Sequence, residues 1–148
     1  MVLSVKLPHA AYDITIEGGA LNRAGELFDL DRRCLVVTDD GVPSIYAETV
    51  AKQCDFAVLT SDNPRYEDPL DIIGAIEKGY RRFSMKYVVV PDRERAIDYA
   101  LDYIKQGDVL LVAGKGGETY QEIMGIKYHF DDQDIIAEIL KNKGEERC

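Results

Sequence analysis

The chain has 148 residues, of which 46% are hydrophobic and 30% are charged, and its formal net charge is −9. This size and composition predict one globular domain with a sizeable core, and the acidity excludes the basic surface that nucleic acids or anionic membranes require. No apolar run is long enough to cross a bilayer, and the first residues show no signal-peptide pattern. Cys34, Cys54 and Cys148 have no metal-ligand spacing, so we expect a reducing, cytoplasmic environment.

The first 30 residues predict a β-hairpin followed by a short helix. Apolar and polar residues alternate over residues 2–7 and 12–17, which is typical of half-buried strands, and Gly18-Gly19 favours a turn. These two strands are expected to pair antiparallel. Residues 21–30 then show a helical pattern.

From residue 34 onward, continuous apolar runs alternate with amphipathic segments. Runs of this kind indicate strands that are buried on both faces, and a strand–helix alternation predicts a parallel sheet covered by helices. The predicted strands are 34–38, 56–60, 87–90 and 109–113, with an edge strand at 126–130, and the predicted helices are 42–53, 70–82, 92–105 and 132–143. We therefore expect an α/β fold over residues 1–148: a three-layer, Rossmann-like, mostly parallel sheet with helices on both faces and an N-terminal β-hairpin. On the helix at 70–82, the core side is predicted to carry Leu70, Ile73, Ala75 and Ile76.

Ligands of such sheets bind beyond the carboxyl ends of the strands, which here are followed by loops at 38–41, 60–69 and 113–118. In the second loop, Arg65 offers a planar fork suited to a carboxylate, and Asn63 offers a donor and an acceptor. Asp62 and Glu67 could hold an ammonium group. The residue types alone favour a different interpretation, in which the loop only leads into a helix capped by Asp68 and Arg65 pairs with Glu67 or Asp68.

The third loop is rich in glycine around Lys115. Glycines after a strand let backbone N–H groups approach an anion, and a lysine adds positive charge. The spacing differs from that of a Walker loop, however, and no hydroxyl follows the lysine to bind magnesium. Phosphate binding and a purely structural turn both remain open, and the pattern favours the turn. His9 and His129 have no partners in a catalytic order, so we predict no nucleophile, metal site or cofactor.

Three stretches resemble the Mur ligases that add the third peptide residue in peptidoglycan synthesis. They are DFAVLTSDNPR at 55–65 with the following EDP, GDVLLVAGKGGETYQ at 107–121, and HFDD at 129–132. The resemblance implies that Asn63 and Arg65 face the distal carboxylate of meso-diaminopimelate. It also implies that Gly114 and Glu118 hold its amino end, with Asp62 and Lys115 in the same site.

Some positions depart from that family. Gly117 stands where the family has histidine, Gln133 where it has arginine, and Tyr66 where a small residue is common. No segment of the sequence resembles the family's P-loop domain or its nucleotide-sugar domain. We therefore expect a domain of residues 55–148 that is not catalytically competent alone, with incomplete ATP and magnesium sites and a small diamino acid as its partner.

Residues 1–54 resemble the start of 3-dehydroquinate synthase, through YDITIEGGAL at 12–21 and LVVTDDGVP at 35–43. This second resemblance implies that Thr38, Asp39 and Asp40 lie where that family contacts the adenosine of NAD, although its later glycine-rich motif and zinc-bearing domain are missing. The chain is then a hybrid joined near residue 54, arising as a gene fusion, a decayed paralogue or a chimera. Two further hypotheses are a self-associating structural module and residual nucleotide binding.

Overall fold

The computed structural model describes residues 2–7, 10–15, 34–38, 54–115 and 117–145. The chain divides into two compact units, Met1–Asp31 and Arg32–Cys148. In the first unit, β1 (Val2–Leu7) pairs antiparallel with β2 (Ala10–Thr15), so the predicted N-terminal hairpin is confirmed. The second strand begins two residues earlier than predicted. The turn at Gly18-Gly19 and the helices at 21–30 and 42–53 lie outside the described residues.

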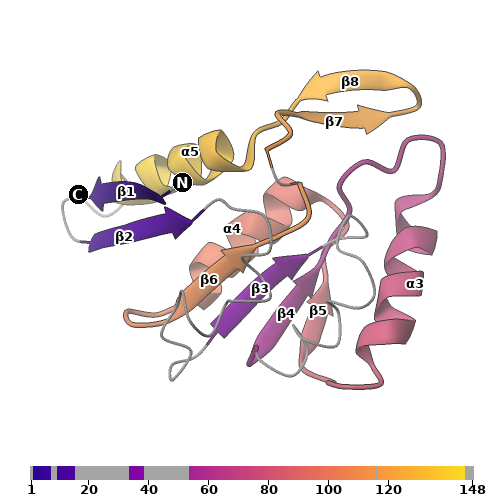
Figure 1. The fold of residues 1–148 in the computed structure, drawn as a ribbon, viewed down its shortest axis with the longest axis horizontal. Helices are drawn as coiled ribbons and strands as arrows, with labels where there is room; N and C mark the ends of the chain where they lie inside the picture. The colour runs from indigo at the N-terminus through magenta and orange to yellow at the C-terminus, as the bar shows by residue number, and fades with distance from the viewer. Residues whose placement is uncertain (1, 8–9, 16–33, 39–53, 116, 146–148) are drawn as a thin grey trace. The chain divides into compact units, whose positions relative to one another are not determined.

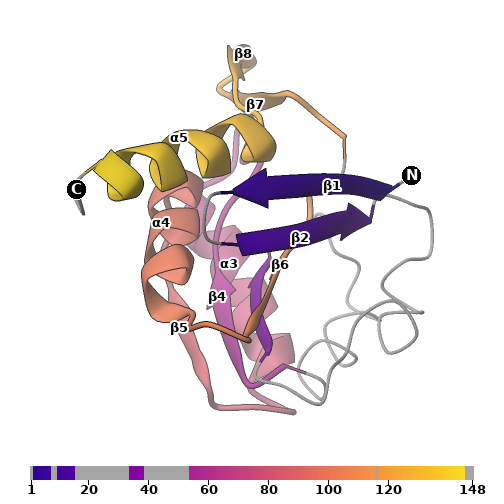
Figure 2. The same cartoon turned by 90° about the vertical axis from the view of Figure 1, so that its left-hand side faces the viewer.

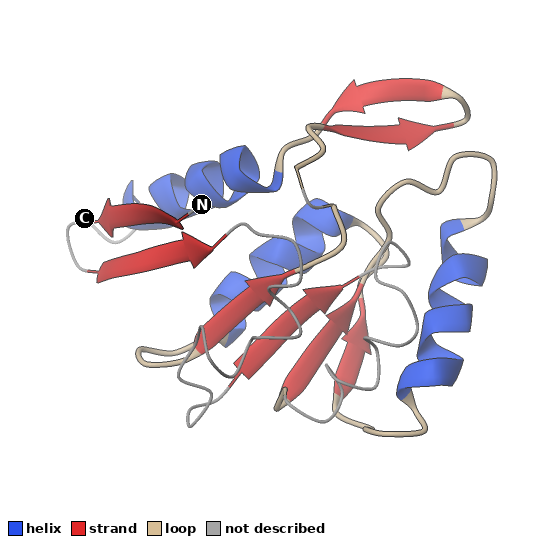
Figure 3. Cartoon of the chain, in the orientation of Figure 1, coloured by secondary structure: helices blue, strands red, loops and turns tan. Residues whose placement is uncertain are grey.

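The second unit is built on a four-stranded parallel sheet (Figures 1 and 3). Its strands, in the order β5-β4-β3-β6, are β5 (Tyr87–Val89), β4 (Phe56–Leu59), β3 (Cys34–Thr38) and β6 (Val109–Val112). The central pair is fully buried, with Val37, Val58 and Leu59 inaccessible to solvent. The predicted parallel sheet is therefore confirmed, and its apolar strands form the core of this unit.

Among the described residues, the helices of this unit are α3 (Pro69–Tyr80), α4 (Arg93–Tyr103) and α5 (Asp132–Glu145). α4 packs on β3, β4 and β6, α3 packs on β4, and α5 packs on α4 (Figure 2). The crossovers through α3 and α4 run in opposite directions along the sheet, so their usual right-handedness places the two helices on opposite faces. Among the described residues, no helix is long and apolar enough to span a membrane.

The buried side of α3 differs from the predicted one. Ile72, Ile73 and Tyr80 are buried, whereas Leu70 is 59% exposed and Ala75 is also exposed. Asp68 caps the helix by accepting the Leu70 N–H at 2.8 Å, and the helix starts at Pro69. At 100° per residue, positions 70 and 75 then lie about 60° outside the stripe formed by positions 72, 73, 76 and 80. The predicted helix is therefore present, but the side of it that faces the core differs from the predicted side.

A separate antiparallel hairpin consists of β7 (Tyr120–Ile123) and β8 (Ile126–His129). A strand is thus present near the predicted 126–130, but it pairs with β7, which was not predicted, and does not form an edge of the parallel sheet. The two residues of the turn, Met124 and Gly125, both have positive φ (51° and 75°), as a type I′ turn requires. All four side chains of β8 are exposed, whereas three of the four residues of β7 are half-buried.

The half-buried Cys54 thiol and the buried Tyr80 phenol meet where β4 begins and α3 ends, and they predict a loss of stability at alkaline pH. Cys54 Sγ lies 3.2 Å from the Tyr80 hydroxyl. Burial raises the pKa of the Cys54 thiol above its ordinary 9.0 and the pKa of the Tyr80 phenol above its ordinary 10.0. Their contribution to stability is complete below those values and is lost as pH rises through the higher pKa values of the folded state.

We expect the free energy of unfolding, measured with urea, to fall as pH rises above about 9. Tyr80→Phe should flatten this dependence, because the phenol no longer titrates. Tyr128→Phe is the matched control, since that ring is 51% exposed. A pH dependence that is the same in Tyr80→Phe and Tyr128→Phe would contradict the assignment.

Candidate functional site

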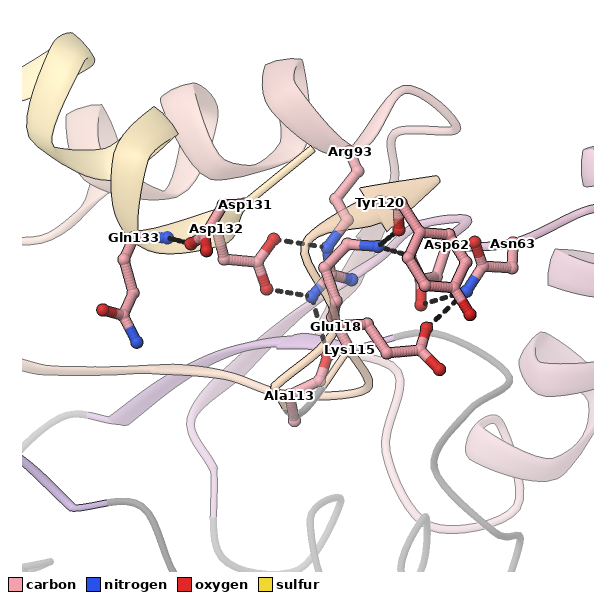
Figure 4. Close-up of polar contacts among 10 residues, drawn as sticks. All are labelled: Asp62, Asn63, Arg93, Ala113, Lys115, Glu118, Tyr120, Asp131, Asp132 and Gln133. Atoms are coloured by element: carbon pink, nitrogen blue, oxygen red, sulfur yellow. Dashed lines mark hydrogen bonds and ion pairs between the residues drawn. The ribbon is translucent and has the colours of Figure 1, made fainter. Parts of the chain in front are cut away.

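The loops that follow β4 and β6 meet beyond the carboxyl ends of these strands (Figure 4). Asn63 Nδ2 donates a hydrogen bond to Glu118 Oε2 at 2.9 Å, joining residues that are 55 positions apart. The end of β3 lies between the two loops, where the buried Thr38 accepts the Thr60 N–H through its backbone oxygen at 2.9 Å. Asp39 and Asp40 lie outside the described residues, so nucleotide binding there stays a prediction.

A buried ion pair joins the same two loops. Lys115 Nζ lies 2.5 Å from Asp62 Oδ1, and the two side chains are only 1% and 7% exposed. The contact is an ion pair without hydrogen-bond alignment, since Asp62 Oδ1 has no hydrogen-bond partner, and the ammonium donates to the Tyr120 backbone oxygen at 2.5 Å. The positive charge of Lys115 is therefore compensated by groups inside the protein. A direct contact of Lys115 or Asp62 with a ligand stays a prediction.

The amide of Asn63 is held in one orientation. Its Nδ2 donates to Asp62 Oδ2 at 3.2 Å and to Glu118 Oε2 at 2.9 Å, while its Oδ1 accepts the Glu122 N–H at 2.7 Å. A flipped amide would turn its oxygen toward two carboxylates and its NH₂ toward a backbone donor. The surroundings therefore select one rotamer, and one lone pair of Oδ1 remains for a further donor.

Arg65 lies two residues after Asn63 in the same loop. Its side chain is exposed, and among the described residues its guanidinium has no ion pair with Glu67 or Asp68. Asp68 caps α3, so the helix-entry part of the alternative interpretation is correct, but the proposed pairing of Arg65 is absent. The fork of Arg65 is thus available for a carboxylate.

The glycine loop brings the Glu118 carboxylate to the amide of Asn63. Gly114 has φ 115°, a conformation that residues with a side chain rarely adopt, and it turns the chain sharply after β6. The Glu118 N–H then donates to the Lys115 oxygen at 3.1 Å, and the Glu118 side chain is exposed. The two loops therefore offer an amide and a carboxylate in contact, and an exposed arginine two residues after the amide in the chain. These residue types suit a group that bears both negative and positive charge.

A second buried ion pair lies beside the site and was not predicted. Arg93, whose side chain is inaccessible, donates from Nε and Nη2 to the two carboxylate oxygens of Asp132 at 2.8 and 2.7 Å. Its Nη2 also donates to the Ala113 oxygen at 3.2 Å. This bidentate contact ties the starts of α4 and α5 to the end of β6 (Figure 4). A signal existed in the sequence, because Arg93 shares the helical spacing of the buried Ala96, Ile97 and Ala100.

The described residues contain no group of histidine, cysteine, aspartate and glutamate side chains that could hold a metal ion. The sequence model of the family described as "Mur ligase, glutamate ligase domain" matches residues 19–116, which is 98 of the 148 residues. The chain belongs to the Mur ligase family.

Curated relatives of this Mur ligase domain carry the name UDP-N-acetylmuramoyl-L-alanyl-D-glutamate–2,6-diaminopimelate ligase. The protein of Cytophaga hutchinsonii is 49% identical over 102 residues, which cover 68% of this chain and 21% of that protein. The protein of Parabacteroides distasonis is 41% identical over 130 residues, covering 83% of this chain and 27% of that protein. The chain thus spans between a fifth and about a quarter of the length of these relatives.

A solved structure of a ligase with the same name matches the fold. Its TM-score is 0.79 at 23% identity, and the match covers 97% of this chain and 31% of that chain. This likeness supports the α/β fold with its mostly parallel sheet. The family match also includes residues 19–54, and the resemblance of residues 1–54 to 3-dehydroquinate synthase is not shown by these comparisons.

Proposed function

We propose that this Mur ligase domain binds the distal end of a diamino acid of the meso-diaminopimelate type. Arg65 and Asn63 would face the distal carboxylate, and Glu118 with the backbone of Gly114 would hold the amino group. Because both hydrogens of the Asn63 amide go to Asp62 and Glu118, Asn63 would donate to the carboxylate only by giving up one of these bonds, and Arg65 would supply the main contact. The observation that carries the proposal is the contact between Asn63 and Glu118, which brings the two loops together at 2.9 Å. The names of the relatives, which are 2,6-diaminopimelate ligases, support the same ligand class.

The charges of the site fit such a ligand. The distal carbon of a diamino dicarboxylic acid carries a carboxylate and an ammonium side by side, so a receptor needs a cation and an anion a short distance apart. The guanidinium of Arg65 can bind a carboxylate with two parallel hydrogen bonds. The Glu118 carboxylate accepts one hydrogen bond from Asn63 and has lone pairs left for an ammonium. Lysine lacks the distal carboxylate and would leave Arg65 without a partner.

We propose amino-acid recognition, rather than ligation by itself, as the contribution of this domain. The buried pair of Asp62 and Lys115 supports recognition indirectly, because Asp62 orients the amide of Asn63. The hybrid origin of residues 1–54, nucleotide binding at Thr38, and self-association stay predictions. Light scattering over a range of protein concentrations would test self-association.

We predict that Arg65→Met weakens binding of meso-diaminopimelate by about 10-fold or more, because a charge-assisted contact is lost. Binding of L-lysine should change little, so the preference between the two ligands should disappear. Calorimetric titration of the purified chain measures both affinities. Arg82→Met removes an exposed arginine next to the end of α3 and is the matched control.

The proposal fails if millimolar meso-diaminopimelate produces neither heat nor NMR shifts in residues 62–66 and 114–118 of the unmodified chain. Equal affinities for meso-diaminopimelate and L-lysine would retain a binding site but exclude the role of Arg65.

A further inference from the structure

The backbone of Arg65 adopts an unusual conformation. Its φ of 53° lies in the left-handed region, which is unfavourable for a residue with a Cβ atom. Such a conformation persists only where the surroundings hold it. The direction in which the guanidinium leaves the loop therefore depends on whatever contacts this backbone.

Those contacts come from β7 and its turn. The Arg65 N–H donates to the Glu122 oxygen at 3.0 Å, and the Arg65 oxygen accepts the Met124 N–H at 2.5 Å. Arg65 and Ile123 also form an isolated parallel bridge. The neighbouring Asn63 accepts the Glu122 N–H at 2.7 Å. Both backbone polar groups of Arg65 are thus bound by the β7–β8 hairpin.

The next residue, Tyr66, contacts the turn of the same hairpin. A Cβ atom added to Gly125 would meet the Tyr66 hydroxyl and would lie 3.3 Å from its ring carbon Cζ. The ring can lie there only because residue 125 has no side chain and accepts a φ of 75°. Tyr66 is otherwise 73% exposed, so its placement over the turn does not come from burial in the core.

We propose that Tyr66 and the turn at Met124 and Gly125 are positioning residues for Arg65. They act through its backbone, so the β7–β8 hairpin sets the preference for a ligand with a distal carboxylate. This inference rests on the proposed function, since Arg65 is the group that would bind that carboxylate. The backbone contacts of Glu122 extend the same control to Asn63.

Two variants of the full chain test the proposal. Gly125→Ala introduces a methyl group where the Tyr66 hydroxyl lies, and Tyr66→Ala removes the ring. The control for the first is Gly107→Ala, which has a similar positive φ of 92° but open space around its Cβ. The control for the second is Tyr128→Ala, because Tyr128 is 51% exposed on β8 of the same hairpin.

The first measurement is amide hydrogen exchange without any ligand. We expect the N–H groups of Arg65 and Met124 to exchange about 10-fold faster or more in Gly125→Ala and Tyr66→Ala than in either control. The second measurement is the ratio of affinities for meso-diaminopimelate and L-lysine, which should fall on the order of 10-fold in the same variants. The affinity for L-lysine itself should stay constant.

Unchanged exchange at Arg65 and Met124 in both variants would overturn the proposal. So would an unchanged ligand preference where the unmodified chain discriminates. If the unmodified chain binds neither ligand, the proposed function fails, while the exchange measurement still decides whether the hairpin positions Arg65. If Gly125→Ala does not fold, Tyr66→Ala carries the test, because it removes an exposed side chain.

Discussion

Lys115→Met is expected to lower the free energy of unfolding by about 3–5 kcal/mol. The substitution leaves the Asp62 carboxylate, which is 7% exposed, without its cation, and it removes the donor to the Tyr120 oxygen. Burying an unpaired charge costs more than the pair contributes, so the loss comes mainly from the group left behind. In urea unfolding, the midpoint should fall while the slope with denaturant concentration stays unchanged.

The partner substitution separates this effect from a general loss of packing. Asp62→Asn in the Lys115→Met background removes the stranded charge, so the double variant should be more stable than Lys115→Met alone. Lys105→Met, at an exposed lysine, should change stability by no more than about 0.5 kcal/mol. A double variant that is less stable than Lys115→Met would show that the charge of Asp62 is not the cause.

Arg93→Met is the second substitution with a large expected effect, a loss of about 3 kcal/mol. The expected value lies at the low end of the range for buried pairs because Asp132 keeps 18% of its side chain exposed and water can partly solvate it. The Ala113 oxygen also loses a donor. Since the pair ties α4 to α5 and β6, thermal unfolding monitored by circular dichroism should begin at a lower temperature.

Arg95→Met provides the control, because Arg95 is exposed in the same helix. Equal melting temperatures for Arg93→Met and Arg95→Met would contradict the role of the buried pair. Arg93→Lys gives a further comparison, since this substitution keeps the positive charge but cannot form the bidentate contact with Asp132. We expect its stability to lie between that of the unmodified chain and that of Arg93→Met.

The sheet was predictable because its strands are continuous apolar runs. The helix starts at Pro69 and Arg93 were also near the predicted ones, because Asp68 and Asp92 are caps that act within one turn. The β7 strand was missed for a physical reason. Its hairpin is held by backbone hydrogen bonds and a tight turn, and β7 is only four residues long, so its sequence YQEI shows little hydrophobic periodicity.

For the site, the residue types of Asn63, Arg65 and Glu118 indicated a charged ligand. The family resemblance led us to expect that the two loops contact the same ligand. The sequence could not show that Lys115 turns inward. A lysine between glycines usually faces solvent or an anion, and only the packed structure places a buried carboxylate, 53 positions earlier in the chain, within 2.5 Å of it. Interactions over such separations depend on the sheet order, which no local pattern encodes.

The dependence of Arg65 on β7 has a consequence for the time at which the site can form. Arg65 and Glu122 are 57 positions apart, so a ribosome adding about 5–20 residues per second would synthesise the hairpin roughly 3–11 s after the loop that it holds. During that interval Arg65 lacks the two backbone contacts that hold it in the left-handed conformation. The sheet strands β3 and β4 and helix α3 can begin to associate earlier, but the carboxylate-binding geometry must wait for the C-terminal third of the chain.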